Sequence, residues 1–174
     1  MTEYETRVNK CHIELGIAAE YQKLCDLPIQ KEATNLVHIG QDIFDRPQQL
    51  EKQAATAWFN LRDAAKKDDV TLNVVSAYRS LEKQVLIFRR KLDNGSDIYD
   101  ILKVNVAPGF SEHHTGRALD LTTPDSQPLS ESFEDTAAFN WLIDHAGACD
   151  FTLSYPRNNG KVAYEPWHWA FQVK

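Results

Sequence analysis

Three residues of the types that bind zinc lie in two segments that are far apart in the chain. Residues 111–120 read SEHHTGRALD and supply His113 and Asp120, whereas residues 165–168 read EPWH and supply His168. Zinc accepts imidazole nitrogen and carboxylate oxygen, and a zinc ion with three protein ligands keeps a fourth position open for water, as catalytic sites do. Any fold of this chain must therefore bring the two segments together, and we expect a catalytic metal site rather than a structural one.

A further carboxylate belongs to the second segment. Glu165 lies three residues before His168, and Pro166 between them restricts the backbone. A free carboxylate beside a metal site can accept a proton from water and return it to a departing amine. The spacing therefore predicts Glu165 as the general base of a hydrolytic reaction.

Hydrophobic periodicity and turn residues predict that helices come first and strands cluster late. The predicted helices cover 3–25, 47–69, 81–92 and 132–146. The predicted strands cover 36–39, 70–75, 118–122, 151–155, 161–164 and 167–173. This order favours one α+β domain, 1–174, with a small, mainly antiparallel sheet flanked by helices. We expect a helical N-terminal part at about 1–69 and a catalytic core at about 70–174.

Composition excludes several classes of function. The net charge is −6 and the pI is about 5.5, so the chain is a poor candidate for binding nucleic acid or an anionic membrane. No apolar segment approaches the ~20 residues that span a bilayer. The first residues do not resemble a secretory signal, so we expect a cytoplasmic protein. The three cysteines form no C-x-x-C pair, which argues against a zinc ribbon, and no protein partner is implied.

Three motifs in this order resemble the VanY-type D-alanyl-D-alanine carboxypeptidases, which are zinc peptidases. Residues 111–120 match S-x-H-x-x-G-x-A-x-D, residues 165–168 match E-x-W-H, and residues 78–84 match Y-R-S-x-x-x-Q. The resemblance covers about 70–171, and the residues before it carry no functional inference. Three motifs in the right order are far more specific than any one of them.

The resemblance implies a fold of the Hedgehog/DD-peptidase type and a role for each motif residue. It implies Zn²⁺ as cofactor, with His113, Asp120 and His168 as ligands and Glu165 as the base. Arg79 is expected to meet the oxyanion of the tetrahedral intermediate. The expected substrate-binding residues are Ser111, Gln84 and Tyr78.

The resemblance also implies a peptidoglycan stem peptide as substrate. We predict an L,D-carboxypeptidase that converts murein tetrapeptide to tripeptide in cytoplasmic recycling. The alternatives are a D,D-carboxypeptidase or D-Ala-D-Ala dipeptidase, then an endolysin-type enzyme that cuts L-Ala-D-Glu. A zinc-binding module without turnover, as among Hedgehog-like proteins, is the alternative from another class, and such a module has no need of Glu165.

The other histidines and aromatic residues favour structural roles. His114 adjoins a candidate ligand and is expected to serve in packing or in support of the site. No other metal-binding or catalytic residue type lies at a characteristic spacing from His12, His38 or His145. The tryptophans after residue 140 are expected in the core. Tyr155 and Tyr164 are candidates for the wall of a cleft, and the sequence does not decide between that and the core.

Overall fold

A four-stranded antiparallel sheet forms the centre of the fold and confirms the α+β class. The computed structural model describes residues 1–160 and 162–173. The strands run in the order β3-β4-β6-β5, with neighbours antiparallel. Their bounds are Asn73–Ser76 (β3), Ala118–Thr122 (β4), Phe151–Leu153 (β5) and His168–Phe171 (β6). A separate hairpin pairs β1 (Leu36–Gln41) with β2 (Pro47–Glu51).

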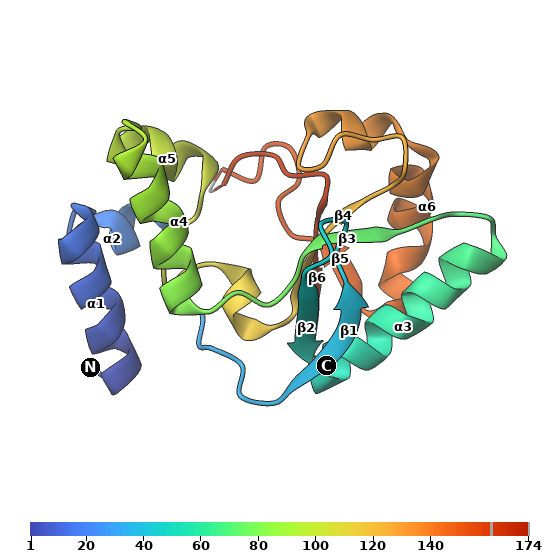
Figure 1. Cartoon of the computed structure of the whole chain (residues 1–174), viewed down its shortest axis with the longest axis horizontal. Helices are drawn as coiled ribbons and strands as arrows, with labels where there is room; N and C mark the ends of the chain where they lie inside the picture. The colour runs from blue at the N-terminus through green and yellow to red at the C-terminus, as the bar shows by residue number, and fades with distance from the viewer. Residues whose placement is uncertain (161, 174) are drawn as a thin grey trace.

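The helices divide into two groups on either side of the molecule. Figure 1 shows α1 (Glu3–Leu15), α2 (Tyr21–Cys25), α4 (Leu81–Asp93) and α5 (Ile98–Val104) together at one end. The sheet, the hairpin, α3 (Lys52–Lys67) and α6 (Ala137–His145) form the other end. Short 3-10 helices cover Glu112–Thr115, Glu131–Asp135 and Ala146–Cys149. In the described part of the chain, no helix has both the length and the apolar character that a membrane crossing needs.

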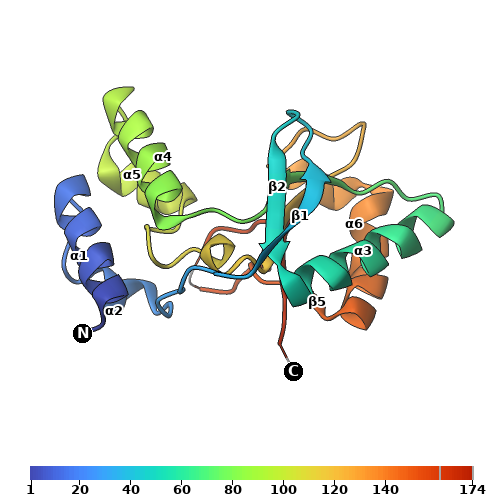
Figure 2. The same ribbon diagram turned by 60° about the horizontal axis from the view of Figure 1, so that its bottom comes forward.

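The two ends of the ribbon seen in Figures 1 and 2 each have their own hydrophobic cluster. The sheet cluster is built around Trp58, Leu119, Leu121, Phe133 and Phe151. The helical cluster is built around Val8, Leu81, Phe88, Ile101 and Phe110. Because Leu50 and Trp58 belong to the sheet cluster, the hairpin and α3 pack with the catalytic part of the chain although they precede residue 70.

The prediction of a helix from residue 47 was wrong for its first turn. Residues 47–51 form β2, in which Gln48 and Leu50 are buried while Pro47 and Gln49 are exposed. This period of two is that of a strand. The helix begins after Glu51, whose carboxylate accepts hydrogen bonds from the first backbone N–H groups of α3.

Several other boundaries differ from the sequence prediction. The first predicted helix ends at Gly16, which adopts φ 71°, and α2 follows separately. Helix α5 was missed, although Asp97 caps it by accepting from the Tyr99 N–H. Residues 162–164 form no strand, and Lys161 lies outside the described residues. Strands β3, β5 and β6 lie where strands were predicted, with ends that differ by at most three residues.

Candidate active site and metal centre

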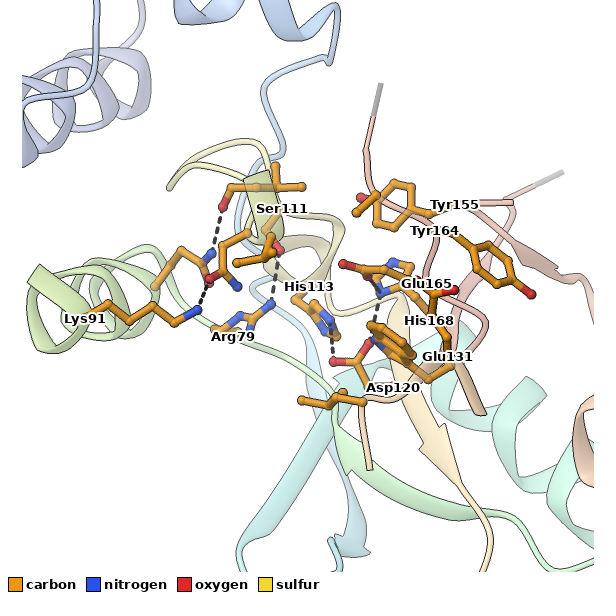
Figure 3. Close-up of a pocket in the computed structure, with 17 residues that line it drawn as sticks. Arg79, Lys91, Ser111, His113, Asp120, Glu131, Tyr155, Tyr164, Glu165 and His168 are labelled. Carbon is orange, nitrogen blue, oxygen red and sulfur yellow. Dashed lines mark hydrogen bonds and ion pairs between the residues drawn. The ribbon is translucent and has the colours of Figure 1, made fainter. Parts of the chain in front are cut away.

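The sheet brings the two distant motif segments together. In the antiparallel pairing of β4 with β6, Asp120 lies directly opposite His168. His113 reaches the same point from the 3-10 helix that precedes β4. One ligand atom from each of the three residues lies within 4.8 Å of the others, and Figure 3 shows the three side chains converging. The structure therefore assembles the set that the sequence predicted.

These three side chains are buried and already oriented toward one another. Their exposed fractions are 2% for His113, 6% for Asp120 and 2% for His168. The two carboxylate oxygens of Asp120 lie 3.1 Å from His113 Nε2 and 3.0 Å from His168 Nδ1. Burial would raise the pKa of Asp120, but the two histidines outweigh it and hold the pKa far below its usual range. A buried set of two imidazoles and one carboxylate fits a zinc ion.

The turn that carries His113 depends on a glycine. Gly116 ends the 3-10 helix with φ 65°, in the left-handed region. A Cβ at this position would lie 2.8 Å from the backbone nitrogen of Glu51. The Gly116 carbonyl accepts a hydrogen bond from that same nitrogen at 2.8 Å, so this residue docks the turn against the end of β2.

Each candidate histidine ligand has a protein partner on its other ring nitrogen. His113 Nδ1 lies 2.6 Å from the Ala77 carbonyl oxygen, and because a carbonyl only accepts, Nδ1 donates and Nε2 is left for a cation. His168 Nε2 lies 2.9 Å from Glu112 Oε2, which leaves Nδ1 for a cation. Such outer contacts fix the tautomer and orientation of metal-binding histidines.

The Ala77 carbonyl is itself held in place by the hairpin. The Ala77 N–H donates to Gln48 Oε1 at 3.0 Å, and Gln48 Nε2 donates to Asp42 Oδ2 at 2.7 Å. Gln48 and Asp42 are both buried. A chain of hydrogen bonds therefore runs from the hairpin to His113, and we call Asp42, Gln48 and Ala77 the hairpin clamp.

Glu165 lies beside His113, Asp120 and His168, which we call the metal triad. Its Oε2 is 3.8 Å from His168 Nδ1, and its backbone carbonyl accepts from the His168 N–H at 3.0 Å. Burial raises the pKa of Glu165 to about 7, with opposition from His168 and Arg79 and support from Asp120. A carboxyl group with a pKa near neutrality can both accept and return a proton.

Arg79 and His114 form a second connected pair. His114 Nδ1 donates to the Arg79 carbonyl at 2.6 Å, and His114 Nε2 accepts from the Gly109 N–H at 3.0 Å. Burial lowers the pKa of His114 to about 4, which keeps the ring neutral in this arrangement. The Arg79 guanidinium donates to Ser111 Oγ at 3.4 Å, and among the described residues no carboxylate forms an ion pair with it. His114 therefore supports Arg79, as the sequence predicted for a histidine outside the ligand set.

A cleft of about 380 Å³ gives access to these groups. It includes the metal triad, Glu165 and Arg79, together with Gln84, Ser111, Tyr155 and Tyr164 (Figure 3). Gln84 is buried at 1% exposure, and its Nε2 donates to the Val106 carbonyl at 2.8 Å. Its Oε1 is buried and has no partner among the described residues, so the cleft wall keeps an unsatisfied acceptor at Gln84.

Tyr78 is not among the residues that line this cleft. Its hydroxyl donates to Glu32 Oε1 at 3.4 Å, and Glu32 also accepts the Leu81 N–H at the start of α4 at 2.9 Å. The structure therefore brings Arg79, Gln84 and Ser111 to the site and directs Tyr78 elsewhere.

Sequence reasoning missed two groups of the site. Glu112 directly precedes His113, and a carboxylate within a motif of metal-binding residues is a signal for an outer partner of a ligand. Lys91 lines the cleft from the same face of α4 as Gln84. The separation of seven residues puts both on one side of a helix, and that spacing is visible in the sequence once α4 is known to border the site.

The comparison with protein families gives a match over most of the chain. The family model VanY, described as D-alanyl-D-alanine carboxypeptidase, matches residues 47–174. All three motifs of the candidate site fall inside this range.

Individual relatives point to the same family. YodJ of Bacillus subtilis, provisionally named a carboxypeptidase, is 39% identical over 132 residues, covering 72% of this chain and 47% of YodJ. The LD-carboxypeptidase LdcB is 33% identical, with a TM-score of 0.72 over 83% of this chain and 71% of LdcB. A variant of the vancomycin-resistance D,D-pentapeptidase VanY in complex with Zn(II) is 25% identical, with a TM-score of 0.63 over 83% and 82% of the two chains. The chain spans about half the length of the curated relatives it matches.

Proposed function

The chain belongs to the VanY family of D-alanyl-D-alanine carboxypeptidases, and on this premise we propose that it is a zinc-dependent carboxypeptidase of peptidoglycan stem peptides. The observation that carries the proposal is the meeting of a buried His-Asp-His set with Glu165 in one cleft. A module that only binds zinc has no use for a buried carboxyl group held 3.8 Å from a candidate ligand.

His113, Asp120 and His168 would hold the zinc ion. When bound, zinc polarises the carbonyl of the peptide bond and lowers the pKa of water to near neutrality. The zinc-bound relative in the family supports this choice of metal.

Glu165 would move the proton during hydrolysis. Its carboxylate accepts a proton from the attacking water and passes it to the nitrogen of the departing D-Ala. A nearby divalent cation stabilises the carboxylate form and pulls the pKa of Glu165 downward, which favours the form that accepts the proton.

Arg79 would stabilise the negative charge that develops on the carbonyl oxygen. Its guanidinium lines the cleft and has no ion-pair partner among the described residues. A charge held ready in this way needs little reorganisation during the reaction. Ser111 and Gln84 also line the cleft and would bind the terminal D-Ala.

We propose L,D-carboxypeptidase activity, which removes D-Ala from the L-centre of the third residue of a tetrapeptide. The likeness to LdcB, an LD-carboxypeptidase, supports this specificity. D,D-carboxypeptidase activity on a pentapeptide is the second candidate, because the family model and the VanY relative carry that description. The role in cytoplasmic recycling stays a prediction, and fractionation of cells that produce the protein would test it.

Product analysis by mass spectrometry tests the proposal. Zinc-loaded protein is incubated separately with murein tetrapeptide and pentapeptide, and Glu165→Gln protein serves as the control for contaminating peptidases. Loss of one Ala from the tetrapeptide is the expected result. Loss of Ala from the pentapeptide alone would replace the L,D assignment with D,D, and hydrolysis of neither peptide would overturn the carboxypeptidase proposal.

A further inference from the structure

Tyr155 belongs to none of the three sequence motifs, yet it contacts a candidate metal ligand and the candidate base. Its ring stacks on the His168 ring, with centroids 4.5 Å apart and planes 16° from parallel. Its backbone carbonyl accepts a hydrogen bond from the Glu165 N–H at 3.1 Å. Tyr155 is therefore fixed to both a candidate ligand and the candidate base, and it lines the cleft (Figure 3).

The hydroxyl of Tyr155 has no hydrogen-bond partner among the described residues, although the side chain is only 7% exposed. Buried tyrosines usually pair their hydroxyl with a protein acceptor. Tyr164 follows that rule, because its hydroxyl donates to Glu134 Oε2 at 2.7 Å. Two tyrosines thus line one cleft, and only the hydroxyl of Tyr155 is left for a molecule bound there.

The surroundings indicate which part of a peptide would meet this hydroxyl. Tyr155 and Arg79 line the same cleft as the metal triad. The groups on α4, Gln84 and Lys91, lie on the helical side, where the free carboxylate of the substrate is expected. The Tyr155 hydroxyl belongs to a residue that contacts Glu165 and His168. It is therefore placed to donate a hydrogen bond at the peptide bond that is cut.

We propose that Tyr155 is a catalytic residue whose hydroxyl donates a hydrogen bond to the carbonyl oxygen of the scissile bond. It acts together with Arg79 and keeps its proton throughout, so it stabilises developing negative charge without proton transfer. The inference rests on the proposed carboxypeptidase function and adds a residue that none of the three motifs contains.

Two matched variants test this role. Tyr155→Phe keeps the ring on His168 and removes only the hydroxyl, whereas Tyr164→Phe removes a hydroxyl that the protein already engages. We expect kcat on the peptide that the parent protein cleaves to fall about 100-fold in Tyr155→Phe, with KM and zinc affinity within about twofold. Tyr164→Phe should keep kcat within about threefold. A phosphinate analogue of the cleaved dipeptide unit should bind Tyr155→Phe more weakly by the same factor as kcat falls.

Stability and zinc affinity separate this role from a structural one. Removal of an unpaired buried hydroxyl should leave the unfolding midpoint of Tyr155→Phe unchanged or higher. Unchanged kcat with raised KM would overturn the proposed contact, as would an equal loss in the two variants. A fall in zinc affinity that accounts for the lost activity would make Tyr155 a support of His168 and also overturn it. An active parent with a fully active Tyr155→Phe rejects this inference alone, whereas an inactive parent rejects the carboxypeptidase proposal and this inference with it.

Discussion

The two walls of the cleft differ in how their polar groups are satisfied. On the sheet wall, each histidine of the triad bonds Asp120 through one ring nitrogen and a second protein acceptor through the other. On the helical wall, Gln84 leaves its Oε1 without a partner among the described residues. Lys91 on the same wall donates to Asn105 Oδ1 and to no other side chain in the described part of the chain. The candidate metal ligands are thus held by protein partners, whereas the helical wall keeps hydrogen-bonding capacity that the described residues do not satisfy.

This difference suggests a division of labour between the two hydrophobic clusters. The strands that carry Asp120 and His168 of the triad pack in the sheet cluster. Gln84 and Lys91 lie on α4, which packs in the helical cluster. Changes to the sheet wall should affect metal binding and kcat, and changes to the helical wall should affect KM. The following predictions test that separation.

Loss of a triad residue should have the largest effect. His168→Ala removes one of three candidate ligands, so zinc affinity should fall by more than the ~100-fold that loss of an outer contact causes. Hydrolysis should become undetectable. Zinc competition with a chelator measures the first effect. His145→Ala is the control, because His145 is exposed and, among the described residues, its hydrogen bond and ring contact are with Trp141, away from the cleft. A full zinc complement in His168→Ala would remove His168 from the ligand set.

Loss of the base Glu165 should lower kcat without changing zinc binding. Glu165→Gln keeps the shape of the side chain and removes its ability to accept a proton, so kcat should fall by about 10²- to 10⁴-fold. Steady-state kinetics and metal analysis measure both quantities. Glu131→Gln, which also changes a carboxyl group that lines the cleft, should retain kcat within a few-fold. Retained hydrolysis in Glu165→Gln would reject the mechanism.

Loss of the outer carboxylate should weaken zinc binding to an intermediate degree. Glu112→Ala removes the acceptor on His168 Nε2, and zinc affinity should fall by about 10- to 100-fold. Glu112→Gln can still accept the hydrogen bond and should lie between the parent and the alanine variant. If all three proteins bind zinc equally, the sheet wall is not organised through this contact.

A change on the helical wall should appear in KM. Gln84→Met removes the unpaired acceptor and the bond to Val106, so KM should rise by up to about tenfold, the equivalent of one hydrogen bond. Zinc affinity and kcat should stay near the parent values. Gln53→Met, at an exposed position of α3, is the control. A fall in kcat equal to the rise in KM would break the proposed separation between the walls.

The hairpin clamp should give a small effect on stability that depends on pH. Burial would raise the pKa of Asp42, but hydrogen bonds from the Arg46 and Phe44 N–H groups and the Arg46 side chain outweigh it, so the pKa is lowered. A lowered pKa adds stability above the ordinary value of about 4, and this contribution is lost as pH falls through the folded-state pKa. Asp42→Asn should therefore cost about 1 kcal/mol at pH 7.

Denaturant unfolding at several pH values checks this prediction. The difference between parent and Asp42→Asn should shrink as the pH drops below about 4. Asp45→Asn changes an exposed carboxylate in the same turn and should leave stability nearly unchanged. A difference that stays constant with pH would show that the charge of Asp42 is not what stabilises the hairpin.

The sequence was enough to predict the centre of the site, because the residues that indicate it lie close together within each motif. Within residues 111–120 and 165–168, the spacing alone indicates which side chains act together. Elements with strong periodicity, such as α4, were also predicted within one residue of their ends. Strand β2 was read as helix because its pairing partner, β1, is a separate segment and its short apolar pattern fits both periods.

By itself, the sequence determined the three candidate ligands, the base and the α+β class, since residue type and close spacing specify these directly. The tertiary structure decided which neighbours support them. It brought Glu112 to His168, linked Gln48 to Ala77, and directed Tyr78 to Glu32 while Tyr155 came to the cleft. Which partner each of these residues contacts depends on strand register and on the packing of segments distant in the chain, and local spacing does not specify that partner.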